Sequence, residues 1–258
     1  MIVAGIDAGS RAIKVALLDA DRLEVVGSGL MDQGVRQEAL ASQLFEQVLG
    51  EAGIGRADVA RTVATGYARN IVAEADTTIT EITCHACGVH HGVPEARTVI
   101  EIGGQDSKLL RLNGDGGVRD FAMNDRCAAG TGRFLEMAAQ RLGVDLSGLG
   151  RMAARSQRPA AISSMCVVFA ETEIIGLLAS GTPHEDIVAG VQASIASRVA
   201  GMVGRGLVPP VVFTGGVALI PGMAEALQAA LCMPVRVAPD PQMTGAVGAA
   251  ILAARAVR

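Results

Sequence analysis

The chain lacks the features that mark several large classes of protein. It has 258 residues, with no tryptophan, one tyrosine and five phenylalanines, and its formal net charge is −4. A chain without a basic excess has no electrostatic footprint for nucleic acid. It has no apolar run of the roughly 18 residues that span a bilayer. Asp7 interrupts the first apolar stretch, which is unlike a signal peptide. These absences predict a protein with neither a nucleic-acid nor a membrane partner.

Cysteine is sparse, and two common nucleotide-binding sequences are missing. The five cysteines are unevenly spaced, which is unlike the framework of a disulfide-rich secreted domain. We therefore expect reduced thiols and a cytoplasmic location. No GxxxxGK[ST] or GxGxxG sequence is present, which argues against the P-loop and dinucleotide-binding folds.

Glycine is abundant, with 32 residues, and half of the chain is apolar. This length accommodates one large or two modest domains. Apolar periodicity and turn residues predict a mixed α/β chain. Strands are expected at Ile2–Ile6, Ile13–Leu18, Leu23–Gly27, Thr62–Ala64, Thr98–Ile102, Ser107–Leu112, Val118–Met123, Val211–Thr214 and Val235–Ala238. Helices are expected at Gln37–Leu49, from about Ile79, after an N-cap at Thr131, from a capping box at Thr182–Glu185, at Pro221–Leu231 and at Thr244–Ala256.

Two strand-turn-strand units resemble each other. Asp7-x-Gly9 is followed by Lys14, and Glu101-x-Gly103 is followed by Lys108. Each acid precedes its lysine by seven residues, and the two units lie 94 positions apart (101 − 7). A duplicated hairpin predicts two similar half-molecules.

Three turns have the composition of phosphate-binding loops: 7–10, 103–107 and 215–216. Glycines let backbone N–H groups approach phosphate oxygens, hydroxyls add donors, and acids can hold Mg²⁺ through water. Any one such turn is equally expected as a plain connection between strands. Three of them, two of which are repeated, favour nucleotide binding.

Cys127 and Cys166 each precede a helix-compatible run and lie 39 positions apart (166 − 127). A helix N-terminus favours a thiolate and any anionic group bound to it. One chain offers two such ligands, whereas a four-iron cluster takes four, so a symmetric dimer would be needed to supply them. From spacing alone, two ordinary buried cysteines are the favoured interpretation.

Cys84-His85-Ala86-Cys87, with His90 and His91 behind it, is the best local metal signature of the chain. We expect no zinc there, because the stretch fits a helix and lacks a second ligand pair. Cys232, near a helix end, is expected in the core. Glu171 and Glu173 are candidate catalytic carboxylates, but acids in a first turn also simply favour the helix dipole. His184 is expected to be a solvated first-turn residue.

Five stretches of the chain carry a family resemblance. Gly5–Ser10, Glu101–Lys108 and Phe213–Val217 resemble the phosphate-1, phosphate-2 and adenosine motifs of the acetate and sugar kinase, heat-shock chaperone and actin superfamily. Met123–Glu136 and Ser163–Glu173 resemble the ATPases that activate 2-hydroxyacyl-CoA dehydratases, a group that includes benzoyl-CoA reductase ATPase subunits. The resemblance covers nearly the whole chain.

The resemblance implies an α/β fold of duplicated ribonuclease-H-like halves of the actin and sugar-kinase type, with a nucleotide cleft between them. The first half would comprise residues 1–92 plus 238–258, and the second residues 93–237. It further implies that Cys127 and Cys166 ligate one 4Fe–4S cluster that bridges a homodimer, which reverses the interpretation from spacing. The implied cofactors are ATP or ADP, Mg²⁺ and one cluster per dimer.

The resemblance also assigns roles to single residues. Ser10 and Lys14 would contact the β- and γ-phosphates, although a strand lysine can instead face solvent. Asp7 and Asp106 would hold the Mg²⁺ shell, and Gln105 would position the attacking water, which makes Gln105 and Asp106 the catalytic pair. The nucleotide would approach the backbone at Gly9, Gly103, Gly104, Gly215 and Gly216.

The implied function is ATP-driven transfer of a low-potential electron to an iron–sulfur dehydratase, which uses it to start radical elimination of water. The electron donor would be a ferredoxin or flavodoxin, and the system would be anaerobic and oxygen-sensitive. A dimer with a homologous subunit, as part of benzoyl-CoA reductase or another low-potential reductase, is the alternative within the family. A cluster-free small-molecule kinase of the same fold is the alternative from another class. The chain has no residues left for the peptide-binding domain of a chaperone.

Overall fold

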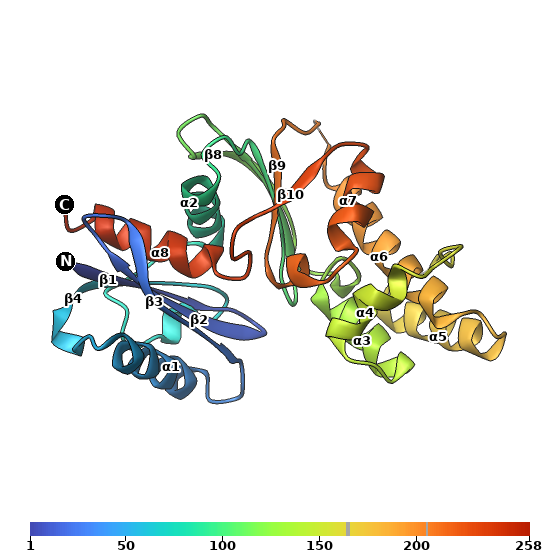
Figure 1. The fold of residues 1–258 in the computed structure, drawn as a ribbon, viewed down its shortest axis with the longest axis horizontal. Helices are drawn as coiled ribbons and strands as arrows, with labels where there is room; N and C mark the ends of the chain where they lie inside the picture. Colours follow the sequence, from blue (N-terminus) through green and yellow to red (C-terminus); the bar gives the residue numbers. More distant parts are fainter. Residues whose placement is uncertain (164–165, 205) are drawn as a thin grey trace. The chain divides into compact units, whose positions relative to one another are not determined.

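The computed structural model describes residues 1–163, 166–204 and 206–258. The chain divides into two compact units. The first comprises Met1–Ala96, Leu112–Arg119 and Gln242–Arg258, and the second comprises Arg97–Arg111 and Asp120–Pro241. Each unit contains a five-stranded mixed sheet with helices packed on it (Figure 1). This architecture confirms the α/β fold predicted from the sequence.

The sheet of the first unit has the strand order β3-β2-β1-β4-β5. Its strands are β1 (Ile2–Ala8), β2 (Ala12–Asp19), β3 (Glu24–Asp32), β4 (Val59–Thr65) and β5 (Thr77–Thr78), and its helices are α1 (Gln37–Ala52), α2 (Glu81–Gly92) and α8 (Thr244–Arg255). Strand β1 pairs antiparallel with β2 and parallel with β4. Helix α1 covers one face of the sheet, and α2 and α8 cover the other (Figure 1).

Alternation along β1 explains this layering. Successive side chains of a strand point to opposite faces. Ala4 and Ile6 therefore pack in the cluster that contains Leu44 of α1. Val3 packs in the cluster that contains Ala250 of α8. Because both faces are covered, the strand is apolar along nearly its whole length.

The sheet of the second unit has the order β10-β9-β6-β7-β8. Its strands are β6 (Thr98–Ile102), β7 (Ser107–Leu112), β8 (Val118–Asn124), β9 (Val211–Thr214) and β10 (Val235–Val237), and its helices are α3 (Gly132–Leu142), α4 (Leu146–Ala153), α5 (Val167–Ala179), α6 (His184–Gly201) and α7 (Met223–Leu231). Inward residues of β6 and β9 form one core with all five helices. Strand β6 pairs antiparallel with β7, as β1 does with β2, so the predicted duplication of the hairpin is present.

Two predicted helix starts are wrong. Helix α6 begins at His184 with Pro183 as its N-cap residue and without a side-chain cap, so Thr182 forms no capping box. Helix α7 begins at Met223 rather than Pro221, after Gly222 with φ of +87°. The two-residue strand β5 and the eight-residue helix α4 are not among the elements predicted from the sequence. Among the described residues, no helix has both the length and the apolarity to cross a membrane.

Backbone contact between α2 and α8 replaces the large side chains that this chain lacks. A Cβ added at Gly248 would collide with the carbonyl oxygen of Cys84, and one at Gly88 would collide with the carbonyl oxygen of Thr244. The two helices therefore touch main chain to main chain. Glycine is required at both positions for packing, not for its backbone freedom.

We predict that Gly248→Ala lowers the free energy of unfolding by about 1–3 kcal/mol, the usual cost of overpacking a tight core. The control is Gly50→Ala on α1, where an added Cβ meets nothing within 4 Å. That change is expected to be stabilising, by about 0.5–1 kcal/mol, because alanine favours the helix. Urea unfolding of both variants measures the difference. Equal effects of the two substitutions would contradict this packing.

Candidate nucleotide and thiol sites

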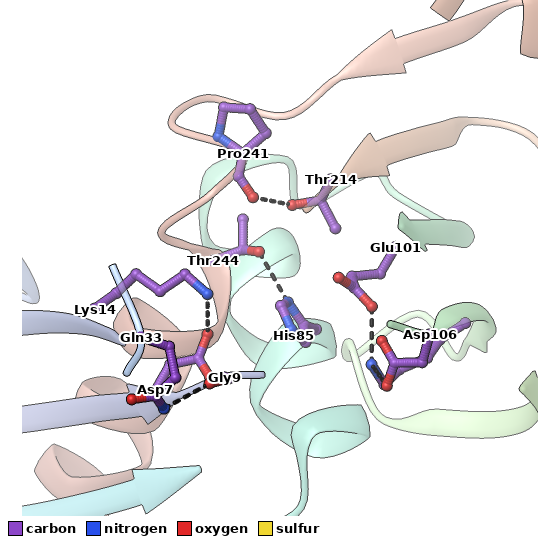
Figure 2. A network of polar contacts seen from close by, with 11 residues as sticks. Asp7, Gly9, Lys14, Gln33, His85, Glu101, Asp106, Thr214, Pro241 and Thr244 are labelled. Carbon is purple, nitrogen blue, oxygen red and sulfur yellow. Dashed lines mark hydrogen bonds and ion pairs between the residues drawn. The ribbon is translucent and has the colours of Figure 1, made fainter. Parts of the chain in front are cut away.

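An ion pair organises the hairpin of the first unit, whose turn is the first predicted phosphate loop. Asp7 at the end of β1 lies directly across the ladder from Lys14 of β2. Lys14 Nζ lies 3.1 Å from Asp7 Oδ2 (Figure 2). Asp7 is buried, and only 14% of the Lys14 side chain is exposed. Lys14 therefore turns inward to the turn that begins at Asp7 rather than facing solvent.

Gly9 is locked into the same turn. Its N–H donates to Ala12 O at 3.1 Å, and its carbonyl accepts from Gln33 Nε2 at 2.9 Å (Figure 2). An added Cβ would lie 2.9 Å from Ala12 O and 3.2 Å from Lys14 Nζ. A side chain at this position would therefore displace the lysine. Ser10 follows as a half-buried residue.

His85 and Thr244 support Asp7 from the helical side of the sheet. His85 Nδ1 and Thr244 Oγ1 are 3.0 Å apart, and both side chains are buried (Figure 2). A Cβ on Gly245 would lie 2.9 Å from Asp7 Oδ2 and 3.1 Å from His85 Cε1. His85 belongs to the Cys84–Cys87 stretch, in which the sequence predicts no zinc site. It lies beside Asp7, the predicted Mg²⁺ ligand. Its partner is 159 residues away, so no local sequence signal identified it.

The hairpin of the second unit repeats the ion pair and adds a second carboxylate. Lys108 Nζ lies 2.9 Å from Glu101 Oε2 and 2.7 Å from Asp106 Oδ2 (Figure 2 shows the two acids). The Lys108 side chain is 2% exposed. The triad therefore carries a net negative charge in a mostly buried place. Glu101 and Lys108 were not among the predicted site residues, although their spacing marked the duplicated hairpin.

The predicted glycines of the second unit lie against this triad. A Cβ on Gly103 would be 2.9 Å from Asp106 Oδ1 and 3.2 Å from Glu101 Oε1. Gly215, with φ of +92°, would place a Cβ 2.7 Å from Glu101 Oε1. Gly216 begins a short 3₁₀ turn after β9. These close approaches leave the main chain uncovered where the predicted phosphate and adenosine loops meet the acids.

Pro241 O fixes the end of β9. It accepts a hydrogen bond from Thr214 Oγ1 at 2.7 Å (Figure 2). It also accepts one from Gly215 N at 2.9 Å. Gln105 is exposed at the tip of the 103–107 turn, and Asp106 beside it is half-buried. The structure thus brings Gly103, Gln105, Asp106 and Gly215 of the predicted set together in one unit.

The same turn is bonded to the helix that follows Cys127. Gly103 O accepts from Gly132 N at 2.9 Å, and Gly104 O accepts from Arg133 N at 3.0 Å. Two amides at the start of α3 are thereby satisfied by the predicted phosphate loop. A Cβ on Gly132 would lie 3.1 Å from Gly103 O, so the residue must be small for this contact.

Cys127 precedes α3, and the predicted N-cap at Thr131 is confirmed. A 3₁₀ turn at Ala128–Gly130 and the N-cap residue Thr131 lie between the cysteine and the helix. Thr131 Oγ1 accepts from Arg133 N, as predicted for a cap. The main chain of Cys127 is held by Asn124, whose Oδ1 accepts from Cys127 N at 3.1 Å and whose Nδ2 donates to Cys127 O at 2.8 Å. Cys127 is half-buried.

Cys166 is the N-cap residue of α5, as the sequence predicted. Its carbonyl accepts from Ala170 N at 2.9 Å, and the residue is exposed. The positive end of the helix dipole favours a thiolate at such a position. Because α3 and α5 pack together in one core and Arg141 forms an ion pair with Glu171 across them, Cys166 and Cys127 lie on connected elements.

The other three cysteines differ from one another in exposure: Cys84 and Cys87 are buried, and Cys232 is exposed. Burial raises the pKa of the Cys84 thiol to about 12, and burial also raises the pKa of the Cys87 thiol. Such thiols resist forming the thiolate that a metal needs. Cys232 is exposed and ends α7 with φ of +53°, so the prediction of a core residue is wrong.

The acids of α5 are not first-turn residues, contrary to the prediction. Glu171 and Glu173 are the fifth and seventh residues of the helix, whose first turn contains no acid. Glu171 pairs with Arg141, and Glu173 accepts from Ser163. His184 is exposed at the first position of α6, as expected.

The donor sets fit the groups implied by the resemblance. Glycine-lined turns with a buried lysine and carboxylates suit a nucleotide with Mg²⁺. Cys127 and Cys166 offer accessible sulfur ligands for an iron–sulfur cluster, whereas Cys84 and Cys87 do not. Two thiolates are half the number that a four-iron cluster takes.

Comparison with known proteins agrees with the family resemblance of the sequence. The family model described as "BadF/BadG/BcrA/BcrD ATPase family" matches residues 4–253. The chain is 42% identical to the 2-hydroxyisocaproyl-CoA dehydratase activator of Clostridioides difficile, over 98% of this chain and 95% of that protein. It is 44% identical to the (R)-2-hydroxyglutaryl-CoA dehydratase activating ATPase of Acidaminococcus fermentans, over 96% and 95%.

Solved structures give the same result. The activator of the 2-hydroxyisocaproyl-CoA dehydratase from Clostridium difficile with bound ADPNP superposes with a TM-score of 0.94 at 42% identity, over 99% of this chain and 95% of that chain. A ROK hexokinase from Thermus thermophilus, at 17% identity and a TM-score of 0.57 over 100% and 99% of the two chains, shares only the fold. One of the subunits of benzoyl-CoA reductase from Thauera aromatica is a more distant relative, 31% identical over 97% of this chain and 92% of that protein.

We predict that Lys108→Met lowers the free energy of unfolding by about 3–5 kcal/mol, because it removes the shared ammonium from two carboxylates in a buried setting. The double change Lys108→Met with Glu101→Gln is expected to recover part of that loss. Arg126→Met serves as the control, because Arg126 is 94% exposed in its pair with Asp125, and such a pair contributes about 0–1 kcal/mol. Chemical denaturation measures all three, and a Lys108→Met variant as stable as the control would contradict the buried triad.

Proposed function

The chain belongs to the BadF/BadG/BcrA/BcrD ATPase family, and we propose that it is an ATP-dependent electron-transfer activator of a 2-hydroxyacyl-CoA dehydratase. The observation that carries the proposal is the connection of two accessible cysteines to the predicted phosphate loop within one unit. Gly103 O and Gly104 O bond the start of α3, directly behind the turn that Cys127 opens. A kinase of the same fold has no use for such cysteines.

The first step is the binding and hydrolysis of MgATP. In the first unit, Asp7 would hold the Mg²⁺ shell, and Ser10 and Lys14 would contact the β- and γ-phosphates. Asp7 has its carboxylate fixed by Lys14 at 3.1 Å, so little reorganisation would be needed on metal binding.

In the second unit, Asp106 would hold Mg²⁺ through water, and Gln105 would orient the attacking water. Lys108 restrains Asp106 at 2.7 Å, which supports a fixed carboxylate beside an exposed amide side chain. The nucleotide would contact the main chain directly at four residues that have no side chain: Gly103, Gly104, Gly215 and Gly216.

Besides the nucleotide, the proposed function requires a 4Fe–4S cluster, which supplies low-potential one-electron transfer when bound. Cys127 and Cys166 would each contribute one thiolate, and a second copy of the chain would contribute the other two. The helix dipole of α5 points its positive end at Cys166 and favours the anionic sulfur there.

The surface of α5 supports the dimer. Val168, Phe169 and Ile175 are 67%, 69% and 49% exposed. The two acids of the helix are turned to partners within the chain, Glu171 to Arg141 and Glu173 to Ser163. The outward face is therefore apolar and continuous with Cys166, as expected of a surface that meets a second copy around a shared cluster.

Nucleotide state would reach the cluster through the 103–107 turn. A change in the position of Gly103 and Gly104 carries the amides of Gly132 and Arg133 with it, because the four groups are hydrogen-bonded. The turn containing Cys127 precedes that helix start, so ATP and ADP would hold the ligand differently. Nucleotide then biases a two-state dimer, as a ligand with different affinity for two states must.

The relative from Thauera aromatica supports a second candidate, the ATPase component of a benzoyl-CoA reductase-type enzyme. The two candidates share ATP hydrolysis and the cluster. They differ in the protein that accepts the electron, and the higher identity to dehydratase activators favours the first.

We predict that the anaerobically purified chain, given MgATP and titanium(III) citrate, starts turnover of a purified 2-hydroxyacyl-CoA dehydratase, and that neither ATP nor reductant alone does so. Cys127→Ser is expected to abolish the activation, because one cluster ligand is lost. Cys232→Ser, at an exposed cysteine that ends α7, is expected to leave it unchanged. The measurement is enoyl-CoA formation. ATP-dependent phosphorylation of a sugar or acyl acceptor, equal in wild type and Cys127→Ser, would instead establish the kinase.

A further inference from the structure

One carboxylate of α5 holds the chain segment that leads to Cys166. Glu173 Oε1 accepts from Ser163 N at 2.9 Å and from Ser163 Oγ at 2.8 Å, and Glu173 Oε2 lies 3.1 Å from the same amide. Ser163 is three residues before Cys166, and Glu173 is seven residues after it. The contact therefore ties Ser163, which precedes the cysteine in the sequence, to the helix that follows the cysteine.

The same segment is fixed upstream by α6. Asp186 Oδ1 accepts from Ser156 Oγ at 2.7 Å and from the amides of Gln157 and Arg158, each at 3.1 Å. These hydrogen bonds hold the pKa of Asp186 below its ordinary value, and the one from Ser156 has the largest effect. Further along, Ala160 N donates to Asp186 O at 2.8 Å.

Ala160 also lies on the surface of α6. A Cβ added at Gly190 would collide with the carbonyl oxygen of Ala160, so the segment and the helix are in main-chain contact. Residues 156–160 are thus anchored on α6, and Ser163 is anchored on α5. Glu173 supplies the anchor nearest to the cysteine.

The dipole of α5 does not account for an acid at position 173. The helix dipole favours acids within the first turn, and Glu173 is the seventh residue. The helix around it is almost wholly apolar, with Glu171 as its other charged residue. Glu171 serves a different contact, its ion pair with Arg141 of α3. The two acids are therefore a matched pair with separate partners.

We propose that Glu173 is a positioning residue for Cys166: its carboxylate holds Ser163 so that the cysteine stays at the N-terminus of α5. This inference rests on the proposed function, in which Cys166 is a cluster ligand. A held ligand releases iron slowly, because the thiolate cannot swing away from the metal. Loss of the carboxylate frees the segment and leaves the other cysteines where they are.

The test compares Glu173→Ala, Glu173→Gln and the matched control Glu171→Gln. The first measurement uses the cluster-free protein, in which hydrogen exchange of the segment ending at Ser163 reports the clamp itself. We expect the exchange rate to rise at least about tenfold in Glu173→Ala, because the loss of hydrogen bonds to a charged group has an effect of this size. Glu173→Gln keeps one acceptor oxygen and is expected to lie between, and Glu171→Gln is expected to match wild type.

The second measurement is the rate at which a ferrous chelator removes iron from the reconstituted protein, followed by the visible spectrum. It is expected to rise about tenfold in Glu173→Ala, less in Glu173→Gln and not in Glu171→Gln. Faster exchange with unchanged iron release would overturn the proposal and leave Glu173 as a structural residue. A wild-type chain that takes up no iron would overturn both the proposed function and this inference, and unchanged exchange in Glu173→Ala would overturn the inference alone.

Discussion

Two main-chain hydrogen bonds, from Gly132 N to Gly103 O and from Arg133 N to Gly104 O, join the predicted phosphate loop to the helix that follows Cys127. These two bonds connect the residues around the loop with the residues around the helix. On one side the loop carries Asp106, which Lys108 restrains together with Glu101. On the other side the helix packs with α5, whose N-cap residue is Cys166. The predicted phosphate loop and the two predicted cluster ligands are thus joined by one set of contacts within the second unit.

Small residues make this connection possible. In this chain of 32 glycines and six aromatic residues, main-chain contacts at particular glycines join several of the elements. Gly132 lets the loop approach α3, and Gly248 lets α8 lie on α2. The second contact places Thr244 and Gly245 beside Asp7 and His85. Packing of this kind leaves little freedom for loops and acids to shift independently, which suits the proposed coupling between the nucleotide and the cluster ligands.

The sequence was informative where the chemistry is local. The duplicated hairpins, with Asp7 and Lys14 in one and Glu101 and Lys108 in the other, were recognised from a seven-residue spacing because strand pairing brings those residues together. The fold followed from these repeats and from the family resemblance. The nucleotide and cluster roles of the individual residues came from the resemblance, and they stay predictions that the geometry supports.

Contacts between distant segments were not predictable. His85 meets Thr244 across 159 residues, and Glu173 reaches back over Cys166 to Ser163. Nothing in the local sequence names either partner. The predicted capping box at Thr182 is absent, because Pro183 occupies the N-cap position and the helix has no side-chain cap. Cys232 was expected in the core, but it ends α7 in the left-handed conformation, exposed.

The most direct measurement of the central claim is iron and acid-labile sulfide in the anaerobically purified protein, together with its molar mass in solution. A cluster shared between two copies predicts about four irons and four sulfides per dimer. Cys166→Ser is then expected to lose both the iron and the dimer, while Cys232→Ser keeps both. A folded, ATP-hydrolysing chain that holds no iron after reconstitution, and whose mass does not change with Cys166→Ser, would contradict the claim.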